Sequence, residues 1–125
     1  MRHTSKLVSA LFFALSASAF ADSLTLSSND ISEGEFMTKK HEYNGFGCSG
    51  DDLSPHLKWS NAPEGTKSFA ITAYDPDAPT GSGWWHWQVV NIAKNVTEVQ
   101  TGVGSTKQNL APKGSMQIEN DYGSK

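Results

Sequence analysis

The sequence has little of what marks an enzyme, a metal protein or a nucleic-acid-binding protein. Its 125 residues include one cysteine, Cys48, and ten basic against thirteen acidic residues, for a formal net charge of −3. Because proteins bind nucleic acid largely by neutralising phosphates with Lys and Arg, this acidic chain is a poor candidate. His41, His56 and His86 lack the spacing of a zinc site, and no Ser, Cys or Thr lies in a recognisable nucleophile motif. We therefore expect no metal, no cofactor and no nucleic-acid partner.

No apolar run reaches the about 20 residues that a membrane-spanning helix needs. The first 21 residues instead have the parts of a secretory signal: a short basic region, an apolar run over 7–15, and alanines at positions 19 and 21. We expect 1–21 to be a signal peptide and 22–125 to be the mature domain, which is periplasmic or secreted, carries a charge of −5 and has no transmembrane anchor. An uncleaved anchor helix is the alternative, and the apolar run is short for one.

Helix signals are missing as well, since no apolar stripe repeats with helical spacing between capping residues. Short alternating segments between Gly- and Pro-rich turns predict strands at 24–28, 36–43, 56–60, 68–74 and 85–92, with weaker alternation over 96–101. The Gly- and Asp-rich stretch 44–55 predicts a long loop, and 75–83 predicts a tight excursion above a sheet edge. This pattern favours an all-β sandwich or barrel.

Acidic, aromatic and imidazole side chains are concentrated around the turn at 75–83. Asp75 ends one predicted strand and His86 lies near the start of the next, so both are expected at one lip of a sheet. Two carboxylates repel phosphate, but one can accept backbone N–H bonds, and a carboxylate beside His86 favours the imidazolium, which attracts anions. The alternatives are turn capping for the aspartates and plain aromatic packing for His86 and the tryptophans.

The run Asp75-Pro76-Asp77-Ala78-Pro79, followed by Trp84, His86, Trp87 and then Val89-Val90-Asn91-Ile92, resembles the phosphatidylethanolamine-binding protein family in its bacterial, Raf kinase inhibitor-like branch. Phe46-Gly47-Cys48 and Leu57-Lys58-Trp59 support the resemblance, which extends over 28–123. It implies a β-sandwich of two antiparallel sheets, Greek-key in type, with a small anion pocket. Carried over by position, it implies ligand binding by Asp75, Asp77, Pro79, Trp84 and His86.

The second half of the family's pocket has no counterpart in this sequence. The family has a Gly-x-Cys-Pro-Pro or Gly-Pro-Pro loop and a later His-x-Tyr strand, whereas here Asn120-Asp121-Tyr122-Gly123 resembles only the start of that loop. We therefore expect a domain that is incomplete at its C-terminus and a pocket open on one side. The missing loop of the bacterial branch usually carries a cysteine, so the resemblance implies a partner for Cys48 outside this chain.

The resemblance implies an exported, non-enzymatic protein that binds phosphate-like anions or phospholipid headgroups, with binding impaired by the missing segment. One alternative is a protein-interaction module that inhibits a kinase or protease through its surface. Another is a hydrolase built on Asp75, Asp77 and His86, for which the sequence offers only a histidine near two carboxylates.

Overall fold

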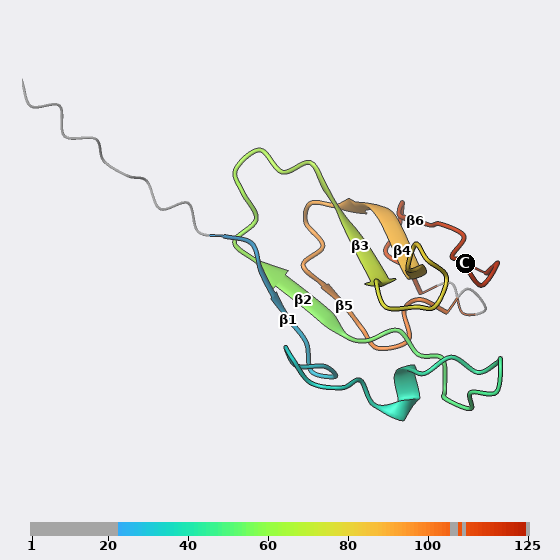
Figure 1. Cartoon of the computed structure of the whole chain (residues 1–125). Helices are drawn as coiled ribbons and strands as arrows, with labels where there is room; N and C mark the ends of the chain where they lie inside the picture. The colour runs from blue at the N-terminus through green and yellow to red at the C-terminus, as the bar shows by residue number, and fades with distance from the viewer. Residues whose placement is uncertain (1–22, 106–107, 109, 125) are drawn as a thin grey trace, which may run out of the picture.

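Two three-stranded antiparallel sheets pack together in the computed structural model of the chain, which describes residues 23–105, 108 and 110–124 (Figure 1). One sheet has the order β1-β2-β5 and the other β3-β4-β6. The strands are β1 (Thr25–Ser27), β2 (Leu57–Ser60), β3 (Ser68–Asp75), β4 (Trp84–Ala93), β5 (Glu98–Val99) and β6 (Met116–Gln117). The predicted all-β class with two antiparallel sheets is confirmed. The predicted signal peptide lies outside the described residues.

The core lies between the two sheets and is built from the alternating apolar positions of the strands. Val89 and Ile92 of β4 are 1% and 0% exposed, and Trp59 of β2 packs its ring edge-on against Phe69 of β3. The buried apolar residues are Leu57, Trp59, Ile71, Val89, Ile92, Val99 and Val103. Burial follows a period of two residues along β2, whereas Val89 and Ile92 of β4 are three residues apart because the register shifts between Phe69 and Ile71.

The hairpin of β3 and β4 contains two register shifts that decide where His86 lies. Ala73 pairs with Trp87, yet the next residue of β3, Tyr74, pairs with Trp85. His86 is thus the extra residue on β4, as in a β-bulge. Bulges bend a strand and redirect a side chain, and they are common next to binding sites. The shift places His86 outside the regular alternation of the sheet.

The predicted strand at 36–43 is wrong. This segment holds a single 3-10 turn, η1 (Lys39–His41), closed by bonds from the His41 N–H to the Thr38 carbonyl and from the Glu42 N–H to the Lys39 carbonyl. The Nδ1 atom of His41 lies 2.6 Å from the Leu53 carbonyl oxygen. Residues 36–39 are exposed and 40–43 half-buried, so the segment buries no apolar face against a neighbouring strand. No helix in the described part of the chain is long and apolar enough to cross a membrane.

A buried histidine ties the first strand to the sheet. His56, 5% exposed, accepts the Asn29 N–H at Nδ1 over 3.0 Å, and its Nε2 lies 2.8 Å from the Glu98 carboxylate. Since Nδ1 is an acceptor, the ring proton is on Nε2 and is donated to Glu98. This bond is the main reason that the pKa of Glu98 is lowered. The imidazole therefore joins the segment after β1 to β5.

Asp30 extends this link to η1. Its carboxylate accepts bonds from the Lys40 ammonium, the Thr101 hydroxyl and the main-chain N–H of His56. These three bonds, that of Lys40 first, hold the pKa of the Asp30 carboxyl well below its usual range. A chain of polar contacts thus runs from the core histidine to the short turn that forms one wall of the candidate site.

Candidate ligand-binding site

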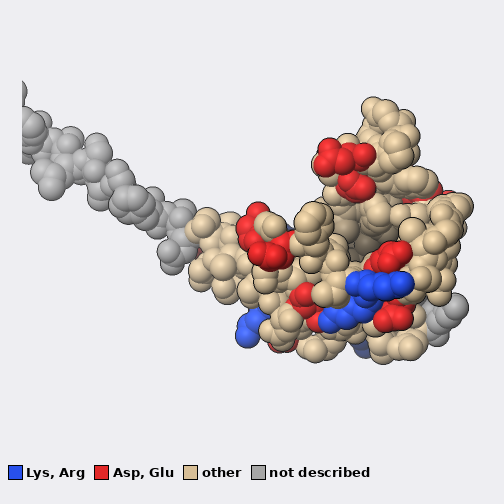
Figure 2. Space-filling model, turned by 60° about the horizontal axis from the view of Figure 1, so that its bottom comes forward, with Lys and Arg blue, Asp and Glu red and all other residues tan. Residues whose placement is uncertain are grey.

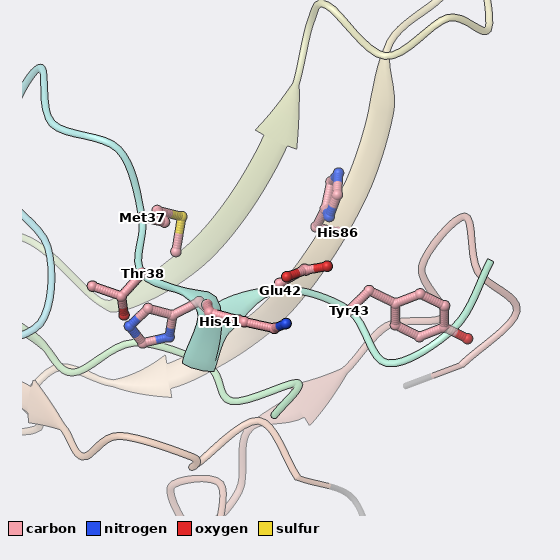
Figure 3. Close-up of a pocket in the computed structure, with 7 residues that line it drawn as sticks. Met37, Thr38, His41, Glu42, Tyr43 and His86 are labelled. Carbon is pink, nitrogen blue, oxygen red and sulfur yellow. The ribbon is translucent and has the colours of Figure 1, made fainter. Parts of the chain in front are cut away.

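A hollow of about 530 Å³ lies between η1 and strand β4 (Figure 3). Figure 2 turns the side of the molecule that carries η1 forward and shows a hollowed face bordered by both acidic and basic side chains. The residues that line the hollow are Met37, Thr38, Lys39, His41, Glu42, Tyr43 and His86. One wall comes from the segment at 37–43 and the other from the bulged strand.

His86 is held by the C-terminal segment of the described chain. Its Nδ1 lies 3.2 Å from the Tyr122 hydroxyl, and the Asn120 amide donates to its carbonyl over 2.9 Å. On the other side its Nε2 is 3.9 Å from Asp75 Oδ2, with the two side chains 40% and 46% exposed. Water screens a pair this exposed, so the contact between Asp75 and His86 adds little to the stability of the fold.

The other predicted site residues divide into two groups. Asp75 accepts the Asp77 N–H at Oδ1 over 2.9 Å, which closes the turn, while Asp77 and Pro79 themselves lie exposed in the loop. Trp84 stacks on Tyr122 with ring centroids 5.0 Å apart, and its Nε1 is buried without a hydrogen-bond partner among the described residues. Of the five, only His86 lines the hollow. Their role as ligand contacts stays a prediction.

Tyr122 is the centre of an aromatic wall, which we define as Tyr43, Phe46, Trp84 and Tyr122. The Tyr43 and Tyr122 rings are 4.3 Å apart, and Phe46 lies 6.1 Å from Tyr122. Gly45 makes room for this packing, since a Cβ there would come within 2.5 Å of the Tyr43 ring. Burial raises the pKa of Tyr122, and nearby acidic groups, among them Cys48 and Asp75, raise it further. The surroundings of Tyr122 thus disfavour added negative charge.

Glu42 lines the hollow between η1 and the aromatic wall. The Ser49 N–H donates to its Oε1 over 3.3 Å, and its carbonyl accepts the Asp52 N–H over 3.0 Å. Gly50 packs so closely that an added Cβ would lie 2.1 Å from that carbonyl oxygen. A hydrogen bond to the Glu42 carboxylate is the main reason that the pKa of the Cys48 thiol is raised, with burial second. The exposed thiol of Cys48 is therefore held in its neutral form.

A metal centre finds no support in the described part of the chain, which holds no group of three or more His, Cys, Asp or Glu side chains able to hold an ion. The hollow combines donors, acceptors and aromatic faces instead. That chemistry suits a small polar organic ligand.

Comparison with known sequences identifies the family. The sequence profile described as phosphatidylethanolamine-binding protein matches residues 27–125. The chain belongs to the phosphatidylethanolamine-binding protein (PEBP) family. It is 50% identical over 117 residues to the UPF0098 protein YbcL of Escherichia coli K12, covering 94% of this chain and 64% of YbcL. It is 48% identical over 100 residues to the UPF0098 protein YbhB of the same organism, covering 80% and 63%.

The fold agrees with this membership. The crystal structure of E. coli YbcL, described as a new member of the mammalian PEBP family, matches with a TM-score of 0.78 at 53% identity, over 80% of this chain and 61% of that chain. The PEBP chain thus spans less than two thirds of the length of these relatives. The resemblance inferred from the residues around Asp75 and His86 is confirmed.

Two parts of the candidate site were missed by sequence reasoning. Glu42 and Tyr43 were assigned to a strand, and Tyr122 was noted only as part of a run that resembles the start of a family loop. Tyr122 meets His86 across 36 residues of sequence. The only available signal was its place in the run Asn120 to Gly123, where Asn120 Oδ1 accepts the Tyr122 and Ser124 N–H groups and so positions the ring.

Proposed function

We propose that this PEBP chain is an exported, non-enzymatic binding protein whose hollow accepts a phosphate-bearing small ligand or lipid headgroup. The observation that carries the proposal is that Lys39 on η1 and His86 on β4 line the same hollow. Both side chains donate hydrogen bonds and both can be cationic, as an anion requires.

The aspartates play a supporting role in this proposal. Asp75 closes its own turn at Oδ1 and presents Oδ2 to His86. Asp75 therefore lies beside the imidazole without lining the hollow, and in this proposal it does not contact the anion itself.

Binding without catalysis is supported by the lining of the hollow. Thr38 is its one aliphatic hydroxyl, and within the described residues that hydroxyl makes no hydrogen bond to a base. A hydroxyl without a base is a weak nucleophile. Export rests on the signal-like sequence at 1–21.

Phosphate titration tests the proposal. Trp84 stacks on the tyrosine that contacts His86, so tryptophan fluorescence reports on the site. We expect inorganic phosphate to change the fluorescence, and His86→Ala to weaken binding about tenfold or more, because a hydrogen bond to a charged group is lost. Lys39→Ala should weaken binding, whereas Lys94→Ala, which removes the same charge from an exposed turn, should not. Equal binding by all three variants would refute the assignment.

A second candidate is a protein-interaction module that inhibits a kinase or protease. Phe36 and Phe46 favour it, since they are 101% and 79% exposed on the segments beside the hollow. Exposed aromatic side chains are enriched at protein interfaces. In this case inhibition of the target enzyme should survive Asp75→Ala and be lost in Phe46→Ser, the reverse of the pattern expected for ligand binding.

A further inference from the structure

Strand β3 forms an open edge of the sheet β3-β4-β6. Its one neighbour in this sheet is β4, and Figure 1 shows β3 at the outer side of the sandwich. Among the described residues, the main-chain hydrogen bonds of β3 run to β4 and to no other segment. The strand has 8 residues, so its outer edge presents a row of free N–H and C=O groups to which another strand can pair.

The β3 edge lacks the features that keep exposed edges apart. Natural edge strands are protected from pairing by lysine, proline or a β-bulge. The stretch from Ser68 to Tyr74 contains no charged residue and no proline. Both register shifts in the hairpin put the extra residue on β4, so β3 itself runs without a bulge. The outer edge of β3 is therefore regular and suited to pairing.

An apolar side chain lies uncovered beside the same edge. Leu26 of β1 is directly opposite Trp59 of β2, and opposite residues share one face of a sheet. Trp59 faces the core and is 5% exposed, yet Leu26 is 65% exposed. The ring contact of Trp59 with Phe69 places β3 over β2, and both sheets run in the same direction across Figure 1. A strand added beside β3 therefore lies over β1 and covers Leu26.

The edge is complementary to itself, which favours a second copy of this chain as its partner. In an antiparallel pairing centred on Ile71, that residue lies opposite its own copy and Ala70 lies opposite Thr72. Lys67, exposed just before β3, then lies opposite Asp75 at both ends of the pairing. Opposite charges directly across two strands are favourable.

We propose that the chain forms a dimer in which β3 pairs with β3 of a second copy in this register. The two three-stranded sheets β3-β4-β6 then form one continuous sheet. Because each copy uses the same edge, the pairing satisfies both copies and the assembly closes at two chains. No residue of β3 lines the hollow, so dimerisation and ligand binding are separate properties and their tests can fail independently.

Sedimentation velocity of the purified chain at increasing concentration tests the dimer. We expect the fraction of dimer to rise with concentration. Lys67→Glu places like charges opposite each other at both ends of the pairing, so it should raise the dissociation constant about tenfold. Lys113→Glu makes the same change of charge on an exposed turn before β6, away from β3, and should leave the constant unchanged. A monomer at every concentration, or equal dissociation constants for the two variants, would overturn the proposal.

Disulfide cross-linking tests the register in a Cys48→Ser background. Ala70→Cys and Thr72→Cys alter exposed side chains on the outer face of β3, so the fold should tolerate both. In the proposed register the two introduced thiols are directly opposite each other only between different variants. Identical positions lie diagonally, at about 7–8 Å, which is too far for a disulfide. Mass spectrometry of an oxidised mixture should therefore find the mixed disulfide in excess over both symmetric ones. Equal yields of all three would contradict the register, and Ser60→Cys, on the other sheet, should not link.

Discussion

Replacing His56 by its two amide analogues tests the buried link between β1 and β5. The ring makes two bonds of different kinds: Nδ1 accepts the Asn29 N–H, and Nε2 donates to the Glu98 carboxylate. The amide group of asparagine ends near the position of Nδ1, and that of glutamine near Nε2. His56→Asn thus keeps the acceptor for Asn29, while His56→Gln keeps the donor for Glu98. We expect His56→Asn to be the more stable variant.

The magnitude follows from the exposure of the groups that lose a partner. Glu98 has a side chain 40% exposed, so water replaces the lost donor and the loss is small. A backbone N–H left without an acceptor costs about 1–3 kcal/mol when buried. The bond of Asn29 is only partly buried, which favours the lower half of that range. His56→Gln should therefore be about 1 kcal/mol less stable than His56→Asn, or about 4–8 °C lower in melting midpoint for a domain of this size.

Thermal and urea unfolding followed by tryptophan fluorescence measure this difference, because Trp59 belongs to the core beside His56. Glu98→Gln is the matched control: it retains an acceptor for Nε2 and should change the midpoint little. If His56→Gln were as stable as the unaltered chain while His56→Asn melted early, the assigned ring proton and the importance of the Asn29 bond would both be wrong.

Three further predictions concern the core, the thiol and acid stability. Ile92→Ala, at a fully buried position, should lower the free energy of unfolding by about 2–5 kcal/mol, measured by urea denaturation, with Ala93→Gly as an exposed control. Because Glu42 raises the pKa of Cys48, Glu42→Gln should speed alkylation of the thiol by iodoacetamide at pH 8, and an unchanged rate would contradict this. Because the pKa of Asp30 is lowered on folding, its ionised carboxylate stabilises the fold above the ordinary carboxyl pKa, and this stabilisation is lost as the pH falls below about 4. Asp30→Asn should therefore be less stable than the unaltered chain at pH 6, and its free energy of unfolding should fall less on acidification.

The hairpin and the family were predictable because their signals are local. Phe69, Ile71 and Ala73 alternate along a strand that ends at Asp75, and the return strand follows one turn later. Period-two burial on one face requires such alternation. The expectation that Asp75 and His86 lie at one end of this hairpin also follows from the sequence, whereas their separation of 3.9 Å depends on the register shift between Ala73 and Tyr74.

The remainder depends on contacts between distant segments. The segment at 36–43 alternates weakly, yet its structure is set by polar bonds of Lys40 to Asp30 and of His41 to Leu53, which no local period reveals. The two-residue strand β6 also depends on a distant segment, since it forms by pairing with Val89 and Val90 of β4. Tertiary partners decide the structure of such segments over local propensity.

The position of His86 depends both on a local bulge in β4 and on a contact with a distant residue, Tyr122. A regular pairing of Tyr74 with His86 would have placed the imidazole beside Tyr74 on the outer face, where Trp85 now lies. The shift of one residue sends His86 to the face with the hollow and lets Tyr122 reach its Nδ1. Asp75, one residue beyond the shift, then falls on the same side. A single unpaired residue in β4 thus turns the imidazole from the outer face to the hollow, with Asp75 and Tyr122 as its neighbours.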